Sequence, residues 1–378
     1  MTESVWISTA DGLAALVRRL AGIAEIAVDT EGDSLHHYPA RLSLVQLAAS
    51  GVGAWLVDPL AVDDLGPFGQ VFGDPRTTTV LHAGDNDLVD LKRRHGLPFA
   101  RIFDTSVAAR FLGAPALGLD VLLTTYVGID LPPSRQKDDW SERPLSEAQL
   151  RYAVGDVAYL LPLKARLVDE LTRVGRLAWV EEECAALAAQ LVPERTTDPA
   201  AYAGLKGARE LTPRGLAILR ELHELRETLA RRLDRPPFKV FNDDVLVRVA
   251  VAVPATRESL AETAGMTPRV IARWGDDVLA AVARGLALAD EALPVLERRS
   301  RPHVSGAVRR RIETLRAWRA EAAPRFGLEP GVLFPNRLIS TVAEAGPQDA
   351  ETLAAVDGFR RWRVDAFGSE LLAALARP

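Results

Sequence analysis

The chain has 378 residues, 48% of them hydrophobic, which is enough for the cores of roughly two or three domains. Its single cysteine, Cys184, excludes an internal disulfide framework and a cysteine-based zinc site. The sequence has neither a signal-peptide pattern nor a run of about 18 apolar residues, so we expect a soluble, cytoplasmic protein without membrane contact.

Charge divides the chain into two parts. Residues 1–199 contain 18 Lys and Arg against 28 Asp and Glu, whereas residues 200–378 contain 28 against 23. An acidic part that could hold metal ions therefore precedes a basic part that could hold phosphates. The basic residues of the second part are nearly all arginine, and genome composition is an alternative explanation for that excess.

The first half of the sequence predicts strands that give way to alternating strands and helices. Short apolar or alternating runs predict strands over residues 23–31, 41–48, 54–57, 78–82 and 101–103. Helical periodicity predicts helices over residues 11–21, 86–95 and from 106 onward. The tight links between the first three strands favour an antiparallel meander, and the later alternation places helices beside the sheet. We therefore expect an α/β fold with a mixed sheet flanked by helices.

A polar loop and a long helix follow this alternation. Residues 128–144 are rich in proline and charge and predict a surface loop. Ser146 is a suitable N-cap for a helix that runs to about residue 174 and is apolar on much of its circumference. Two prolines and two threonines make residues 193–199 a predicted linker.

The remainder of the chain reads as helical and contains a repeat. Matching residues recur 93 positions apart, among them Phe241 with Phe334 and Gly265 with Gly358. A shared offset at several positions predicts two copies of one small helical domain, whereas chance similarity between helices rich in Ala, Leu and Arg is the alternative. The predicted domains span residues 1–195, 205–292 and 303–378.

Two carboxylates end the first long strand. Asp29 and Glu31 are two residues apart, so their side chains project from the same face of the strand. Like charges held this close repel one another unless a cation lies between them. Carboxylate oxygens are the ligands that hard divalent cations such as Mg²⁺ prefer, so the pair is a candidate metal site.

Further acidic residues fall at two later positions. Asp87 lies at a strand-to-helix turn, where Asp85 is a rival and helix capping is the alternative function. Tyr152 and Asp156 are four residues apart and share one face of the long helix. A carboxylate on such an apolar helix is unfavourable unless it is paired or bound to a cation, and Arg151 is a possible partner.

Together these residues resemble the three exonuclease motifs of the DEDD superfamily in its tyrosine subclass. More closely, the chain is similar to the ribonuclease D family over essentially its whole length. The matching segments, in the family's order, are Asp-Thr-Glu (29–31), Tyr-Pro-x-Arg-Leu-x-Leu-x-Gln-Leu (38–47), His-Ala-Gly-x-x-Asp-Leu (82–88), Phe-Asp-Thr (103–105), Asp-Trp (139–140) and Arg-Tyr-Ala-x-x-Asp-Val-x-Tyr-Leu-Leu-Pro-Leu (151–163). The two helical repeats resemble HRDC domains, a match that rests on pattern and position.

The resemblance implies a ribonuclease H-like fold and a site with two divalent metal ions, Mg²⁺ or Mn²⁺. Asp29, Glu31, Asp87 and Asp156 would hold these ions, and Tyr152 would orient the attacking water. A phenol, with an ordinary pKa near 10, is better suited to hydrogen bonding than to proton abstraction at pH 7. The implied reaction is 3′→5′ exonucleolytic hydrolysis that releases 5′-mononucleotides.

The expected substrate is RNA with a free 3′ end, such as a tRNA precursor. Single-stranded DNA is an alternative substrate for the same site, because no residue here is identified as reading a 2′-hydroxyl. A non-catalytic nucleic-acid-binding scaffold is a third hypothesis, against which the complete set of carboxylates argues. The sequence leaves the oligomeric state open.

Substrate contacts are predicted in two loops. Many members of the family have Phe directly after Asp-Thr-Glu, where this chain has Gly32, so a different residue is expected to contact the 3′-terminal base. His36 and Tyr38, together with His37, are candidates for a stacking surface instead, and the alternative is that they are ordinary loop residues. Arg135 and Lys137, in the loop over 128–144, are candidates for phosphate contacts, with a solvated loop as the alternative.

Other notable residues have a structural and a functional interpretation. We expect Asp104 and His82 to be structural rather than catalytic. Clusters of arginine with tryptophan occur near Trp318 and at residues 360–363, and they suit single-stranded nucleic acid through charge neutralisation and stacking. The alternatives are that the arginines form a solvated helix face and that Trp318 and Trp362 belong to the core.

Overall fold

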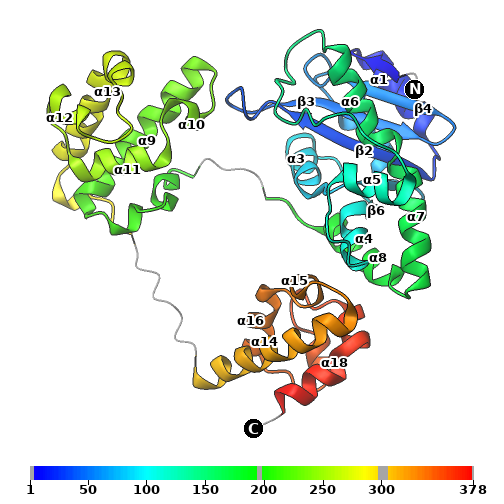
Figure 1. Cartoon of the computed structure of the whole chain (residues 1–378). Helices are drawn as coiled ribbons and strands as arrows, with labels where there is room; N and C mark the ends of the chain where they lie inside the picture. The colour runs from blue at the N-terminus through cyan, green and yellow to red at the C-terminus, as the bar shows by residue number, and fades with distance from the viewer. Residues whose placement is uncertain (1–3, 194–197, 297–304, 377–378) are drawn as a thin grey trace. The chain divides into compact units, whose positions relative to one another are not determined.

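The structure, a computed structural model, describes residues 4–193, 198–296 and 305–376 (Figure 1). It separates into two units. The first unit comprises residues 1–31, 42–194 and 301–378, and the second comprises residues 32–41 and 195–300. The linker predicted over 193–199 and the domain start predicted at 303 fall largely outside the described residues, so the domain boundaries stay predictions.

The first unit is built on a mixed sheet, as predicted. Within the described residues it has six strands in the order β1-β4-β3-β2-β5-β6. The strands are β1 (Ser4–Ile7), β2 (Glu25–Gly32), β3 (Leu42–Ala49), β4 (Gly53–Val57), β5 (Thr78–Leu81) and β6 (Ile102–Asp104). β3 and β4 are antiparallel, whereas β1 is parallel to β4, and β5 is parallel to both β2 and β6. Strand β1, at one edge of the sheet, was not predicted; of its four residues only Ile7 is buried.

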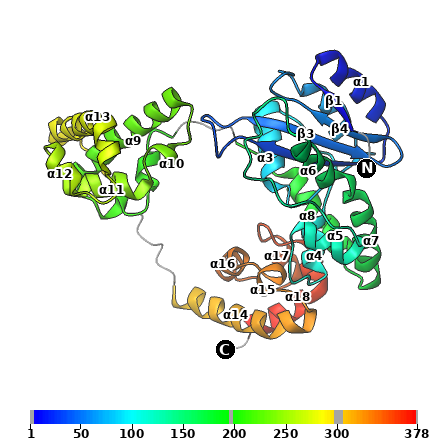
Figure 2. The same ribbon diagram turned by 45° about the horizontal axis from the view of Figure 1, so that its top comes forward.

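Side chains that alternate along the strands give the sheet two covered faces. On one face, Ile26, Val28 and Leu47 belong to the same apolar cluster as residues of α1 (Ala10–Leu20) and α3 (Asp85–His95). On the other face lie Ala27 and Ala48, which share a cluster with residues of α6 (Glu147–Ala158) and α7 (Leu160–Arg173). Figures 1 and 2 show α6 lying across β3 and β4. The predicted helices beside the sheet are therefore confirmed.

The long helix predicted over 146–174 is in fact two helices. α6 ends at Ala158, the next residue Tyr159 has a φ of −112° and a ψ of 2°, which are not helical, and α7 begins at Leu160. Pro162 explains the break, because it has no N–H to donate and its ring would clash with the carbonyl of Ala158 in a continuous helix. The prediction of one uninterrupted helix was wrong at this point.

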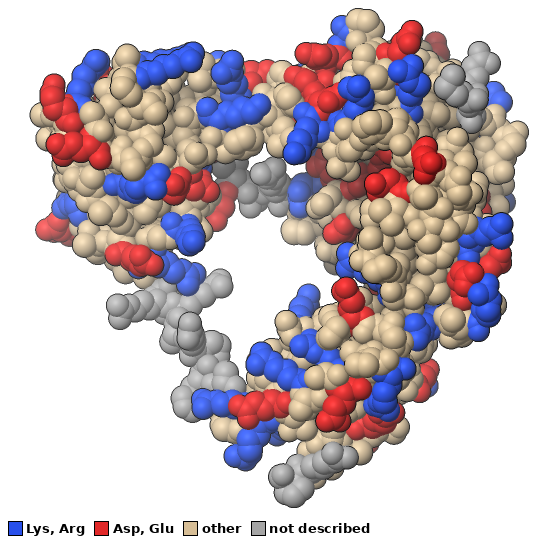
Figure 3. Space-filling view, viewed as in Figure 1, with Lys and Arg blue, Asp and Glu red and all other residues tan. Residues whose placement is uncertain are grey.

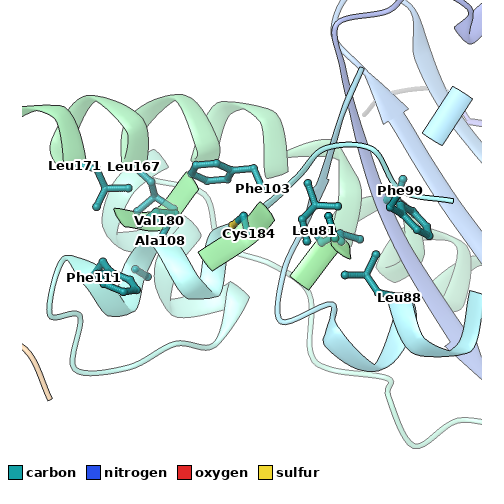
Figure 4. Packing of buried hydrophobic residues seen from close by; sticks show 14 of the residues in the cluster. Leu81, Leu88, Phe99, Phe103, Ala108, Phe111, Leu167, Leu171, Val180 and Cys184 are labelled. Carbon is teal, nitrogen blue, oxygen red and sulfur yellow. The ribbon is translucent and has the colours of Figure 1, made fainter. Parts of the chain in front are cut away.

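The rest of the first unit is helical. Beside the sheet lie α2 (Gly69–Phe72), α4 (Thr105–Phe111), α5 (Leu119–Val127), α8 (Leu177–Ala189) and the 3₁₀ turn η1 (Gly66–Phe68). The carboxyl-terminal bundle consists of α14 (Gly306–Phe326), α15 (Pro330–Leu333), α16 (Asn336–Ala345), α17 (Ala350–Ala354) and α18 (Arg361–Leu375). Both parts contribute to one hydrophobic cluster, so the bundle and the sheet share a core. Figure 4 shows part of this core, with Cys184 of α8 among side chains of α4, α7 and the strands.

The second unit consists of the loop over residues 32–41 and the first helical repeat. Its elements are η2 (Ala201–Gly204), η3 (Ala208–Glu210), α9 (Pro213–Leu233), α10 (Pro237–Val240), α11 (Asp243–Ala252), α12 (Arg257–Ala261), α13 (Pro268–Ala287) and η4 (Asp290–Ala292). None of the described helices is both long enough and apolar enough to cross a membrane.

Equivalent hydrogen bonds confirm the predicted repeat. Arg226 of α9 donates to the carbonyl of Phe241 and pairs with Asp243. In α14, Arg319 donates to the carbonyl of Phe334, at 2.8 Å, and to the side chain of Asn336, at 2.9 Å. Each of these residues lies 93 positions after its counterpart, so the two copies use the same arginine to hold the turn that follows their first long helix.

Candidate active site

Three of the predicted ligands come together between β2 and α6. Asp29 and Glu31 project from the end of β2, and Asp156 faces them from α6; each offers an oxygen within 4.8 Å of those of the other two. Asp156 is buried, and the other two carboxylates are partly buried. Residues that are 125 positions or more apart in the sequence therefore form one acidic cluster, as the motif spacing predicts.

Local contacts fix the helix that carries Tyr152 and Asp156. Ser146 and Gln149 form a capping box at its first turn, in which each side chain accepts a hydrogen bond from the other residue's backbone N–H. The ring of Tyr152 lies 6.0 Å from that of Trp140, which is fully buried under the helix. The cap sets where the helix begins, and the aromatic contact sets which face it turns to the sheet.

Asp87 lies beside this cluster and is held by a second residue of the Asp-Thr-Glu motif. The hydroxyl of Thr30 donates a hydrogen bond to the Asp87 carboxylate. Asp87 is not a member of the closest carboxylate group, yet its charge is near enough to raise the pKa of both Asp29 and Glu31. Asp85, its rival at the same turn, is not among the charges that shift those two groups. The geometry therefore favours Asp87 as the fourth ligand.

The electrostatics of the cluster fit divalent cations. Burial, followed by repulsion from Asp87, Asp156 and Glu31, raises the pKa of Asp29 well above its ordinary value. Burial and the same kind of repulsion raise the pKa of Glu31 to about 8, and burial raises the pKa of Asp156 to about 7. Four carboxylates that resist ionising together are stabilised in their charged form by a bound cation. The donor set, all of it oxygen, is the set that Mg²⁺ and Mn²⁺ prefer.

Tyr152 is held next to the cluster in its protonated form. Burial, together with the negative charges of Asp156 and Glu31, raises the pKa of its phenol. Its hydroxyl is hydrogen-bonded to the Asp156 carboxylate and to Ser134. The group can therefore donate and accept hydrogen bonds at neutral pH but cannot act as a base.

Thr30 and Ser134 are the site residues that the sequence analysis missed. Thr30 stands between Asp29 and Glu31, and its position within the motif was the only signal that could have singled it out. Ser134 lies in the predicted surface loop, where nothing in the sequence distinguishes it from other polar residues. Both act through a neighbour, Thr30 on Asp87 and Ser134 on Tyr152.

The predicted substrate-binding residues lie in two different places. Ser134, Arg135 and Asp138 line a cavity of about 310 Å³ together with Arg151, and Arg135 pairs with Asp138 at 2.8 Å. Asp138 is close enough to Glu31 to raise its pKa, so this loop borders the acidic cluster. The other predicted contact in this loop, Lys137, is exposed.

The aromatic loop residues belong to the second unit. The Tyr38 hydroxyl donates to Glu227, and the guanidinium of Arg231 lies 5.6 Å from the centroid of its ring. His37 lies 2.7 Å from Asp234, and His36 is partly buried. Within the second unit, the ring of Tyr38 is therefore in contact with α9.

The residues predicted to be structural have buried partners. His82 lies 2.9 Å from the hydroxyl of Thr105, and burial lowers the pKa of its imidazole, so the ring stays neutral. The Asp104 carboxylate is buried and caps α4 by accepting hydrogen bonds from the N–H groups of Ser106 and Val107. Neither residue is placed among the clustered carboxylates.

Each basic cluster combines a core tryptophan with exposed arginine. Trp362 and Arg363 are buried against α8, where both hydrogen-bond to Glu183, so the core alternative holds for Trp362, although Arg361 of the same cluster is exposed. Trp318 is also part of the core. Arg309 and Arg310, by contrast, are exposed on α14, and Figure 3 shows Lys and Arg side chains over that helix.

Comparisons with known proteins identify the domains of the chain. Residues 4–172 match the 3′-5′ exonuclease family, and residues 215–282 and 308–375 each match the HRDC domain. A ribonuclease D of Pseudomonas paraeruginosa is 34% identical over 381 residues, which cover 99% of this chain and 98% of the relative. The chain belongs to the ribonuclease D family. A ribonuclease D of Nitrobacter hamburgensis is likewise 34% identical and covers 97% of this chain and 94% of its own length.

A solved structure of the ribonuclease D family extends the match to the whole fold. The crystal structure of Escherichia coli RNase D, described as an exoribonuclease involved in structured RNA processing, has a TM-score of 0.72 and 28% identity. The match covers 99% of this chain and 98% of that one. As a member of the ribonuclease D family, the chain is a 3′-5′ exoribonuclease with an acidic site suited to divalent metal ions.

Proposed function

We propose that the chain hydrolyses RNA from its 3′ end with two divalent ions, Mg²⁺ or Mn²⁺, and releases 5′-mononucleotides. The observation that carries the proposal is the grouping of Asp29, Glu31 and Asp156 within 4.8 Å, with Asp87 beside them. These four carboxylates would hold the ions. When bound, such ions stabilise the attacking and leaving oxygens of an in-line displacement at phosphorus and lower the pKa of a coordinated water.

The residues of this chain supply position and charge. Tyr152 keeps its proton, because burial and adjacent carboxylates raise its pKa, so it holds the attacking water rather than deprotonating it. Its hydrogen bonds to Asp156 and Ser134 fix where its oxygen points. The nucleophile is therefore aligned by a side chain whose own orientation is determined on two sides.

We propose structured RNA precursors, such as tRNA with a 3′ extension, as the natural substrates. The description of the E. coli relative as a processor of structured RNA supports this choice over single-stranded DNA. Arg135 and Lys137 would contact phosphates, since their loop borders the acidic cluster through Asp138. His36 and Tyr38 would contact the RNA from the loop that follows β2.

Digestion of a 3′-extended tRNA and a matched single-stranded DNA, in Mg²⁺, Mn²⁺ or EDTA, tests the proposal. We expect stepwise shortening of the RNA in either metal and none in EDTA. The substitutions Asp156→Asn and Asp87→Asn should each lower the rate by more than about a hundredfold, because they remove direct metal ligands. Asp85→Asn, in the same helical turn as Asp87, should keep nearly full activity and serves as the matched control.

Each alternative gives a different result. Shortening of the DNA alone would identify a DNA exonuclease. Binding of RNA by folded protein without metal-dependent shortening would identify a non-catalytic scaffold. Loss of activity in Asp85→Asn but not in Asp87→Asn would exchange their assignments.

A further inference from the structure

The turn that leads into the Asp87 helix has an unusual backbone. Ala83 has a φ of +51°, in the left-handed region that side chains other than glycine rarely adopt. Gly84 is tightly packed, because a Cβ atom there would lie only 2.8 Å from the Cβ of Leu81. The helix α3 begins at the next residue, Asp85, so the conformation of this turn sets the direction in which α3, and with it Asp87, leaves the sheet.

The carboxylate of Asp104 holds this turn from the neighbouring strand. Its Oδ2 accepts a hydrogen bond from the N–H of Gly84 at 2.9 Å, and its Oδ1 accepts one from the N–H of Ala83 at 3.1 Å. Oδ1 also accepts from Ser106 and Val107 at the first turn of α4, at 2.8 and 3.1 Å. Asp104 is only 2% exposed, and four N–H donors compensate for burying its charge.

These contacts have two distinct purposes. The bonds to Ser106 and Val107 cap α4, which any good N-cap residue could do. The bonds to Ala83 and Gly84 have no part in that cap; they fix a left-handed turn of a type that persists only where its surroundings determine it. A purely structural cap would need one oxygen, whereas this site uses both.

We propose that Asp104 is a positioning residue for the metal ligand Asp87. It fixes the backbone three residues before Asp87, while the Thr30 hydroxyl fixes the carboxylate itself. Asp87 is thus held at two points, through the backbone of the turn that precedes it and through its own carboxylate. The inference rests on the proposed metal-dependent function, because it concerns how strongly the fourth ligand is preorganised.

The test uses the full-length protein and Asp104→Asn. Asparagine is as good an N-cap as aspartate, so α4 keeps its cap. Its amide NH₂ replaces one acceptor oxygen, so the side chain can no longer accept from both Gly84 and the N–H groups bound to Oδ1. We expect the dissociation constant for Mn²⁺ alone, measured by titration calorimetry on nuclease without RNA, to rise by about tenfold or more.

The kinetic expectation follows from the same contact. At low Mn²⁺ the kcat of Asp104→Asn on a single-stranded RNA should fall, and excess Mn²⁺ should restore most of it. The KM for RNA should stay within about twofold of wild type, because Asp104 is buried and offers almost no surface for RNA to contact. A helix cap with no further function would not produce a loss that added metal restores.

Asp349→Asn is the matched control. Asp349 caps α17 by accepting a hydrogen bond from the N–H of Thr352 at 2.8 Å, and it lies in the carboxyl-terminal bundle. The same chemical change there should leave Mn²⁺ affinity unchanged. If Asp104→Asn does not fold, Asp104→Ser, which can cap α4 but has a single side-chain oxygen, takes its place.

Two results would overturn the inference, and a third would overturn its premise. Wild-type Mn²⁺ affinity in folded Asp104→Asn would show that the turn needs no anchor. An equal loss of affinity in Asp349→Asn would show a general effect of destabilisation. Failure of the wild-type protein to bind Mn²⁺ or shorten RNA would instead refute the proposed function itself.

Discussion

The carboxylates between β2 and α6 are unfavourable in their charged form in the folded chain unless a cation is bound. Asp29, Glu31 and Asp156 are brought together by the fold, and burial raises the pKa of each, with repulsion from neighbouring carboxylates adding to the shift at Asp29 and Glu31. Without metal the folded chain keeps protons that the unfolded chain would release near pH 4. Metal binding must displace these protons, so apparent metal affinity should increase as the pH rises towards 8.

A prediction at this scale concerns Glu31→Gln. The pKa of Glu31 is raised from 4.5 to about 8 in the folded chain, so between these values the folded chain holds a proton that the unfolded chain has lost. Because Glu31 ionises more readily in the unfolded chain, the free energy of unfolding of the metal-free protein falls as the pH rises from about 4.5 to about 8. In EDTA, Glu31→Gln should therefore be more stable than wild type at pH 8, by on the order of 1–3 kcal/mol, with a smaller gain at pH 5.5.

Urea unfolding in EDTA at the two pH values measures this difference. Glu181→Gln, at an exposed position of α8, is the control and should change stability little at either pH. A gain for Glu31→Gln that did not depend on pH would contradict the raised pKa.

At the scale of single elements, α8 closes the core beside the site. Cys184 on this helix is buried among Phe103, Ala108, Val180 and their neighbours (Figure 4), and its sulfur accepts a hydrogen bond from the N–H of Asp104 at 3.3 Å. Burial raises the pKa of the thiol to about 12. Packing of α8 against β6 therefore suppresses the reactivity of the only cysteine in the sequence.

We predict that Cys184 resists alkylation until the protein unfolds. With its pKa raised from 9.0 to about 12, the thiolate fraction at neutral pH falls about a thousandfold, and the closed packing lowers access further. Iodoacetamide labelling followed by mass spectrometry should be slow in buffer and fast in urea. Glu181→Cys in a Cys184→Ser background, which places a thiol on the exposed side of α8, is the control; comparable rates for both thiols in buffer would refute the prediction.

At the scale of the whole first unit, the carboxyl-terminal bundle and the sheet domain share one core. The ring of Trp362 stacks on that of Trp179 at 4.5 Å with an interplanar angle of 19°, and it meets Phe111 edge-on at 5.3 Å. Its indole N–H donates to Glu183 at 3.0 Å. This contact makes the bundle part of the same cooperative unit as α4 and α8.

Trp362→Ala should separate the two parts thermally. Loss of a buried tryptophan costs about 3–5 kcal/mol, and here the loss falls on the contact between bundle and sheet domain. Calorimetry of the full chain should show the bundle melting separately and at lower temperature in the variant. Arg361→Ala, which removes only an exposed ion pair with Asp365, should resemble wild type. A bundle that already melts separately in wild type would contradict the shared core.

The sequence by itself determined the local parts of this site. Spacings of two on a strand and four on a helix decide which side chains share a face, so Asp29 with Glu31 and Tyr152 with Asp156 follow from backbone geometry alone. The mixed sheet follows from the order and spacing of the predicted strands and helices, and the helical repeat follows from matching residues 93 positions apart. The edge strand β1 and the break before Pro162 were missed, because Ser-Val-Trp-Ile does not alternate like a half-buried strand and the apolar periodicity continues across the break.

Only the tertiary structure decided which distant segments meet. Thr30 bonds to Asp87, Asp104 reaches the turn before α3, and Trp362 is core rather than a nucleic-acid surface. Such contacts join residues tens to hundreds of positions apart, and they depend on how helices pack on the sheet rather than on any local pattern. The sequence thus determined the chemistry of this exonuclease site, whereas packing decided how its ligands are held.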